Sequence, residues 1–148
     1  MTAKTAADLA AQYAADLADN TAGDIGAADV RGAFGDLTDT LFSANVNAQT
    51  GTGYTLALTD TGRVVTMSNG SANTLTIPTN AAVAFPAGST VTVIQLGAGL
   101  TTIAGDTGVT LNGASAGSGD MGGQYQSAVI LKLATDTWVV CGGIGAVA

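Results

Sequence analysis

Few side chains in this 148-residue sequence could support catalysis. It contains no His, one Cys and eleven acidic residues, all of which are Asp. Catalysis at neutral pH usually needs a group that titrates near pH 7, and without His the Ser–His–Asp and Cys–His arrangements are excluded. One Cys without His cannot supply the four ligands of a zinc site. The sequence therefore predicts a protein that is not an enzyme and that has no metal and no cofactor.

Paired carboxylates are the remaining alternative for chemistry. A glycosidase uses two carboxylates that flank a sugar, and Asp60, Asp106, Asp120 and Asp136 all lie in expected turns. Asp in a turn usually bonds the local backbone. Asp106, Asn112 and Asp120 could offer oxygens to Ca²⁺, but no segment has the spacing of an EF-hand. We interpret these side chains as solvated turn residues.

Three further features could have either a structural or a functional role. Cys141 ends an apolar run, and with no His available it is interpreted as a small buried hydrophobe. Trp138, the only Trp, is interpreted as a core or interface anchor, with stacking on a sugar ring as the alternative. Gly97-x-Gly99 and Gly117-x-Gly119 lack the spacing of a phosphate-binding loop and are interpreted as turn glycines at positive φ.

Charge restricts the partners. Charged residues make up 10% of the chain and the net charge is −7. The basic residues are scattered: Lys4, Arg31, Arg63 and Lys132. Binding of nucleic acid or of an anionic membrane relies on clustered Lys and Arg, so neither is an expected partner. A surface rich in Thr, Ser, Asn and Gly suits protein–protein contact, because few ions must be desolvated.

The N-terminal region predicts a helical arm. Residues 1–42 are expected to form helix, turn and helix, with the turn at 20–23 and the second helix beginning near Gly26. In the second helix four apolar residues follow each other at alternating four- and three-residue spacing, which is typical of a narrow apolar seam. These candidate docking residues are Val30, Phe34, Leu37 and Leu41. Short isolated helices are marginal in water, so the seam is expected to dock onto the β-domain, sister copies or another protein.

The rest of the chain predicts strands. Residues 43–53 are polar and aperiodic and are interpreted as a linker, and 54–148 as a β-sandwich domain. The expected strands are Tyr54–Leu58, Arg63–Met67, Thr74–Ile77, Thr90–Leu96, Leu100–Ala104, Val109–Leu111, Ala128–Ala134 and Thr137–Cys141. Residues 112–123 form the longest expected loop. The fold class is therefore mainly β: a small β-sandwich or jelly-roll-like domain preceded by an N-terminal helix-turn-helix arm. The lack of a fixed-length repeat argues against a β-solenoid.

The Ala-rich N-terminus is interrupted by Asp8, Asp16 and Asp19 before a signal-peptide core can form. No apolar run approaches the about 18 residues that span a bilayer. We therefore expect synthesis in the cytoplasm, without secretion and without a membrane anchor.

Two parts of the sequence resemble virion proteins of tailed bacteriophages. The stretch Asp19-Asn-Thr-Ala-Gly-Asp-Ile-Gly-Ala-Ala-Asp-Val-Arg31 is similar to an N-T-x-G-x-I-[ST]-x-x-x-[VL]-R element of tail-fibre and head-associated proteins. The stretch from Tyr54 to Trp138 resembles the small β-domain of many phage fibre and decoration proteins. The segments that carry this resemblance are 73–78, 84–88, 93–99, 108–112, 123–125 and 131–138.

The resemblance implies a non-enzymatic virion structural protein, often trimeric. The first hypothesis is a homotrimeric capsid decoration or cement protein, made in the host cytoplasm, which binds the major capsid protein or other virion proteins on the capsid exterior. The alternative is a tail-fibre or receptor-binding tip that contacts host-surface glycan. Candidate loop or tip residues are Asn112, Asp120, Tyr125 and Trp138. A third hypothesis is an unrelated acidic binding module or adhesin.

Overall fold

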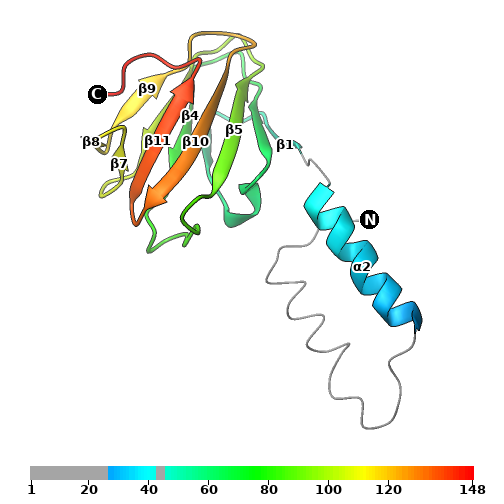
Figure 1. Ribbon diagram of the computed structural model, residues 1–148. Coiled ribbons are helices and arrows are strands. Elements are labelled where there is room, and N and C mark those ends of the chain that lie inside the picture. The colour runs from blue at the N-terminus through cyan, green and yellow to red at the C-terminus, as the bar shows by residue number, and fades with distance from the viewer. Residues whose placement is uncertain (1–26, 43–45) are drawn as a thin grey trace. The chain divides into compact units, whose positions relative to one another are not determined.

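The protein is mainly β, as predicted. In a computed structural model the structure describes residues 27–42 and 46–148 (Figure 1). The chain divides into two compact units, Met1–Asn45 and Val46–Ala148. Each unit is described by itself.

Helix α2, Ala27–Phe42, is the described part of the first unit. It corresponds to the second helix of the predicted arm. The predicted first helix and the turn at 20–23 lie outside the described residues.

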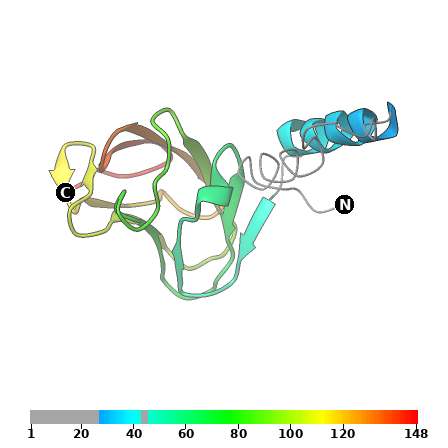
Figure 2. The same cartoon turned by 90° about the horizontal axis from the view of Figure 1, so that it is seen from below.

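Six strands of the second unit alternate between two sheets. The first sheet contains β1 (Val46–Gln49), β3 (Val64–Met67) and β5 (Thr90–Gln95), and the second contains β2 (Gly53–Thr55), β4 (Asn73–Ile77) and β6 (Thr101–Gly105). Within each sheet these strands are parallel. The chain therefore winds three times from the first sheet to the second. Seen from below, the two sheets lie on opposite sides of the core (Figure 2).

We call this winding of parallel strands between the two sheets the coil; the sequence did not predict it. Val46 pairs with Val64, and Val64 pairs with Thr92, across unequal lengths of chain. The turns of the coil share their strand register but not their loop lengths. A search for a fixed-length repeat therefore cannot detect them.

The remaining strands complete both sheets. They are β7 (Thr110–Leu111), β8 (Ala114–Ser115), β9 (Ser118–Asp120), β10 (Ser127–Ala134) and β11 (Thr137–Gly142). The strand orders are β1-β3-β5-β10-β11-β7-β8 and β2-β4-β6-β9. The long β10–β11 hairpin is antiparallel, and β10 also pairs antiparallel with β5. Both sheets are thus mixed, whereas a jelly roll is built from antiparallel strands.

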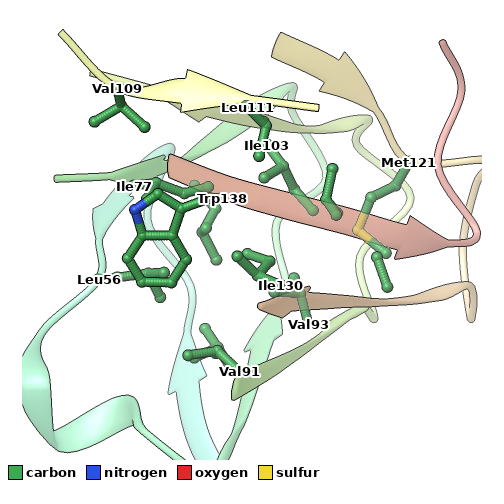
Figure 3. Packing of buried hydrophobic residues seen from close by; sticks show 14 of the residues in the cluster. Leu56, Ile77, Val91, Val93, Ile103, Val109, Leu111, Met121, Ile130 and Trp138 are labelled. Atoms are coloured by element: carbon green, nitrogen blue, oxygen red, sulfur yellow. The ribbon is translucent and has the colours of Figure 1, made fainter. Parts of the chain in front are cut away.

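The two sheets share one core. Alternate residues point inward, as in β4, where Leu75 and Ile77 are buried, and in β5, where Val91 and Val93 are buried. Trp138 lies among aliphatic side chains from both sheets (Figure 3). The labelled side chains of this cluster include Ile77 of β4, Ile103 of β6 and Ile130 of β10, together with Leu56, which follows β2.

Two predicted irregular segments contain strands. The linker predicted over 43–53 is wrong for Val46–Gln49, because β1 pairs along its whole length with β3. Residues 43–45 lie outside the described residues. The loop predicted over 112–123 is also wrong in part, since it contains β8 and β9. In both segments small and polar residues conceal the strand pattern, and the strands form because they pair with neighbours in the sheets: β1 with β3, β8 with β7 and β9 with β6.

Two glycines allow adjacent turns of the coil to pack closely against each other. A Cβ at Gly97 would lie 2.1 Å from the carbonyl oxygen of Asn69, and one at Gly99 would lie 2.0 Å from that of Ser71. Neither glycine has a positive φ, so the interpretation as positive-φ turn glycines is wrong. It is equally wrong for Gly117 and Gly119, where Val147, near the C-terminus, packs on the bare backbone. The lack of a side chain at these positions permits close packing.

Candidate interaction surface

The predicted tip residue Asn112 is used inside the fold. Its side-chain nitrogen donates to the carbonyl oxygen of Val140 at 2.9 Å, and its side-chain oxygen accepts from the Val140 amide at 2.8 Å. The amide group thereby extends the parallel pairing of β7 with β11. Although Asn112 is exposed, its polar atoms are already engaged by backbone.

The other predicted tip residues lie in different places. Asp120 ends β9 and accepts a 2.6 Å hydrogen bond from the Thr102 hydroxyl. Tyr125 is 74% exposed in the connection between β9 and β10. Trp138 is 1% exposed and belongs to the core, which confirms its interpretation as a core anchor and contradicts its placement on a tip. Asn112 lies beside Trp138, because its backbone amide donates to the Trp138 carbonyl oxygen at 3.0 Å. The Trp138 side chain is buried, however, so the four residues do not form one exposed site.

Lys132 is a buried cation that the sequence prediction missed. It is 2% exposed, and its ammonium donates to the side-chain oxygen of Asn80 and, at 2.7 Å, to the carbonyl oxygen of Phe85. Both acceptors lie in the segment that joins β4 to β5, so Lys132 ties this crossover to β10. Asn80 is held in turn by Asp136, whose carboxylate accepts from the backbone N–H of Asn80. A strand alternation that places Ala128 and Ile130 inward also places Lys132 inward.

Asp60 is buried as well, at 1% exposure, so its interpretation as a solvated turn residue is wrong. Its carboxylate accepts from the Tyr54 hydroxyl at 2.7 Å, from the Asn47 amide at 2.8 Å and from the Ala57 backbone at 2.8 Å. Burial, followed by the hydrogen bond and the charge of Asp60, raises the pKa of Tyr54 to about 12. These bonds lock the first turn of the coil, in which β1 and β2 lie.

The side of the seven-stranded sheet that faces away from the core is covered by uncharged side chains. We call this side the outer face. Strand register aligns its central row, in which Val46 pairs with Val64, Val64 with Thr92, Thr92 with Val129 and Val129 with Cys141. The residues of the outer face are Val46, Ala48, Val64, Thr66, Thr90, Thr92, Ile94, Ser127, Val129, Leu131, Leu133, Val139 and Cys141.

Several of these side chains are exposed although they are apolar. Val46 is 58%, Leu133 52% and Val129 38% exposed. Cys141 is exposed, so its interpretation as a buried hydrophobe is wrong. The run Trp138–Cys141 is apolar on both sides of β11, and only the alternation from Trp138 shows that Cys141 points outward. Exposed apolar surface of this kind marks interaction sites more often than single exposed residues do.

None of the charged residues of the second unit occupies a strand position of the outer face. Asp60 and Lys132 point inward and are buried. The other four are outside the strands of the first sheet: Arg63, Asp106, Asp120 and Asp136. The outer face is therefore the uncharged part of an acidic chain.

The helical arm carries a second exposed apolar group. In α2 the side chains of Val30, Phe34 and Leu37 are 41%, 65% and 39% exposed. They form three of the four positions of the predicted seam. The side chain of Leu41 lies outside the described residues.

Within residues 27–42 and 46–148, no group of three or more His, Cys, Asp and Glu side chains is placed to hold a metal ion. No helix of the described part is long and apolar enough to cross a membrane. A scan against protein-family models found no match. A search of curated proteins also found no match.

Proposed function

We propose that this chain is a non-enzymatic structural protein of a tailed-phage particle, and that it serves as a homotrimeric decoration or cement protein on the capsid exterior. The observation that carries the proposal is the distribution of polar groups in the second unit. Lys132 and Asp60 are directed inward as structural ties, while the outer face presents only uncharged side chains. Such a molecule is built for contact with other proteins.

The resemblance of two sequence stretches to phage virion proteins supplies the biological setting of the proposal. Two sheets around a common core are compatible with the sandwich type that the resemblance implies. In this proposal the arm binds the major capsid protein or another virion protein through Val30, Phe34, Leu37 and Leu41. Three arms joined in one trimer would gain avidity of about 10²–10⁴ without any new type of contact.

The proposal is tested by adding the purified protein to capsids that lack it. We expect saturable binding in hundreds of copies per particle and a higher temperature of capsid disruption. The double variant Phe34→Asp and Leu41→Asp should lose binding while its second unit stays folded, as measured by circular dichroism. An unchanged disruption temperature at saturation would contradict the cementing role.

One observation favours a second function, that of a tail-fibre tip. Tyr125 is 74% exposed, and an exposed aromatic ring can stack on a sugar of the host surface. In that case the free protein would block phage adsorption to the host, and Tyr125→Ala would abolish the block. Blocking that persists in Tyr125→Ala would exclude Tyr125 as the contact.

A further inference from the structure

We infer that the outer face of the seven-stranded sheet is where copies of this chain contact each other. The inference rests on the self-association in the proposed function and adds the surface responsible for it. The occupant is another copy of the same chain, and the contact is centred on Thr92 and Val129 in the middle of the face.

Charge identifies the occupant. The second unit of each copy contains four Asp against one Arg and one Lys, which is a net charge of −2, so two copies carry charge of the same sign and repel each other where their acidic side chains meet. The outer face has no charged side chain, and two such faces can approach each other without desolvating an ion. A basic partner, in contrast, would be attracted to surfaces that contain Asp. The outer face therefore offers no attraction to an oppositely charged protein and no repulsion to an identical copy.

The make-up of the face agrees with a contact between copies. Its central row runs across five adjacent strands, from Val46 in β1 to Cys141 in β11. A second row places Leu131 between Thr90 and Val139. β-Branched and aliphatic side chains on a regular sheet lose little rotamer entropy when they are covered. Their burial contributes about 25 cal/mol per Å² of apolar surface removed from water.

Cys141 makes the inference measurable because it is the only cysteine of the chain and it lies at one end of the central row. In the full-length protein, alkylation of Cys141 by iodoacetamide should be several-fold slower at a concentration where the protein is assembled than after dilution to the monomer. Equal rates at the two concentrations, with assembly verified by sedimentation, would overturn the inference.

A matched pair of variants locates the contact. Thr92→Asp places a charge in the centre of the outer face, between Val64 and Val129. Thr76→Asp makes the same substitution on the other sheet, between Thr55 and Ala104. We expect Thr92→Asp to sediment as a monomer with rapid alkylation of Cys141, and Thr76→Asp to remain assembled. A folded Thr92→Asp protein that keeps the wild-type mass contradicts the inference.

Failure to fold is recognised from the fluorescence of Trp138, the only Trp. If Thr92→Asp does not fold, the concentration dependence of Cys141 alkylation in the wild-type chain still shows whether the outer face is covered on assembly. The two proposals can fail separately. A chain that assembles through the outer face but does not bind capsids disproves only the cementing function, whereas a chain that cements capsids while Cys141 stays equally reactive disproves only the self-contact.

Discussion

The ammonium of Lys132 lies 5.5 Å from the centre of the Trp138 ring, and the two residues are direct cross-strand partners in the β10–β11 hairpin. Trp138 packs edge-to-face against Phe85, with ring centres 5.3 Å apart. The carbonyl oxygen of Phe85 accepts from the same ammonium. Lys132, Trp138 and Phe85 thus contact one another in a closed triangle, which joins the hairpin to the crossover between β4 and β5.

Lys132→Met should test this triangle. The substitution keeps most of the aliphatic side chain but leaves the acceptors on Asn80 and Phe85 without their donor. A buried acceptor that loses its partner costs about 1–3 kcal/mol, and a cation–π contact contributes about 0.5–2 kcal/mol. We therefore expect the free energy of unfolding to fall by about 2–4 kcal/mol, measured by urea denaturation with Trp fluorescence.

Arg63→Met is the control for Lys132→Met, because it removes the same charge from a half-buried residue. It should change the free energy of unfolding by less than about 1 kcal/mol. If Lys132→Met is as stable as the wild type, the buried cation is not a structural tie.

The close packing of coil turns at Gly97 predicts a large cost for Gly97→Ala. The added Cβ would lie 2.1 Å from a backbone oxygen of Asn69, and backbone cannot move aside as a flexible side chain can. We expect a loss of at least about 2–3 kcal/mol in the free energy of unfolding. Gly70→Ala is the control, since its Cβ would meet no atom within 4 Å, and it should be neutral. Equal stability of the two variants would refute the packing argument.

Much of the secondary structure is predictable from local patterns. The apolar alternation around Leu75 and around Val91 locates β4 and β5, and the four- and three-residue spacing from Val30 locates α2. The β10–β11 hairpin follows from its turn residue Asp136, which has φ 49°. These signals are local, because they depend only on the period and on the residue type of each element.

The direction of the strands and the location of the outer face are not predictable in the same way. A half-buried strand has period two whether its neighbour is parallel or antiparallel, so the sequence pattern cannot reveal that the strands of the coil are parallel. In β10, residues 128–131 are apolar at every position. Alternation of Leu131 and Leu133 suggests that these residues form the buried side, whereas the structure buries Ile130 and Lys132. Which side of β10 is buried depends on the oxygens of Asn80 and Phe85 that accept from Lys132, and these lie in the distant segment that joins β4 to β5.

Asn112 provides a test between a structural role and a ligand-binding role. Asn112→Ala removes both hydrogen bonds to Val140 at a residue with φ 48°. We expect a loss of about 2–3 kcal/mol in the free energy of unfolding, of which Asn112→Gly should recover up to about 1 kcal/mol because glycine tolerates positive φ. Both losses are measured by urea denaturation. Unchanged stability in Asn112→Ala would instead leave the side chain available as a tip residue.

The contact between Tyr54 and Asp60 predicts a specific loss of stability in alkali. In the unfolded chain Tyr54 ionises around its ordinary pKa of 10.0, whereas burial and Asp60 raise the pKa of the folded protein to about 12. Between these values the unfolded chain has released a proton that the folded chain retains, so a rise in pH favours unfolding. The stabilisation contributed by protonated Tyr54 is complete below pH 10 and is lost as the pH rises through about 12.

Tyr54→Phe isolates this effect. At neutral pH the variant should be less stable than the wild type, because Asp60 loses the 2.7 Å hydrogen bond from the hydroxyl. Between pH 10 and 12 the wild type should lose the stability that protonated Tyr54 contributes, whereas the variant has no hydroxyl at this position and should not show this loss. The difference in free energy of unfolding between the two proteins should therefore shrink. Urea denaturation at several pH values measures this difference, with the exposed Tyr125→Phe as a control that should follow the wild type. Curves for the wild type and Tyr54→Phe that fall in parallel would show that the Tyr54 hydroxyl is not held by Asp60, and that the first turn of the coil is closed by other contacts.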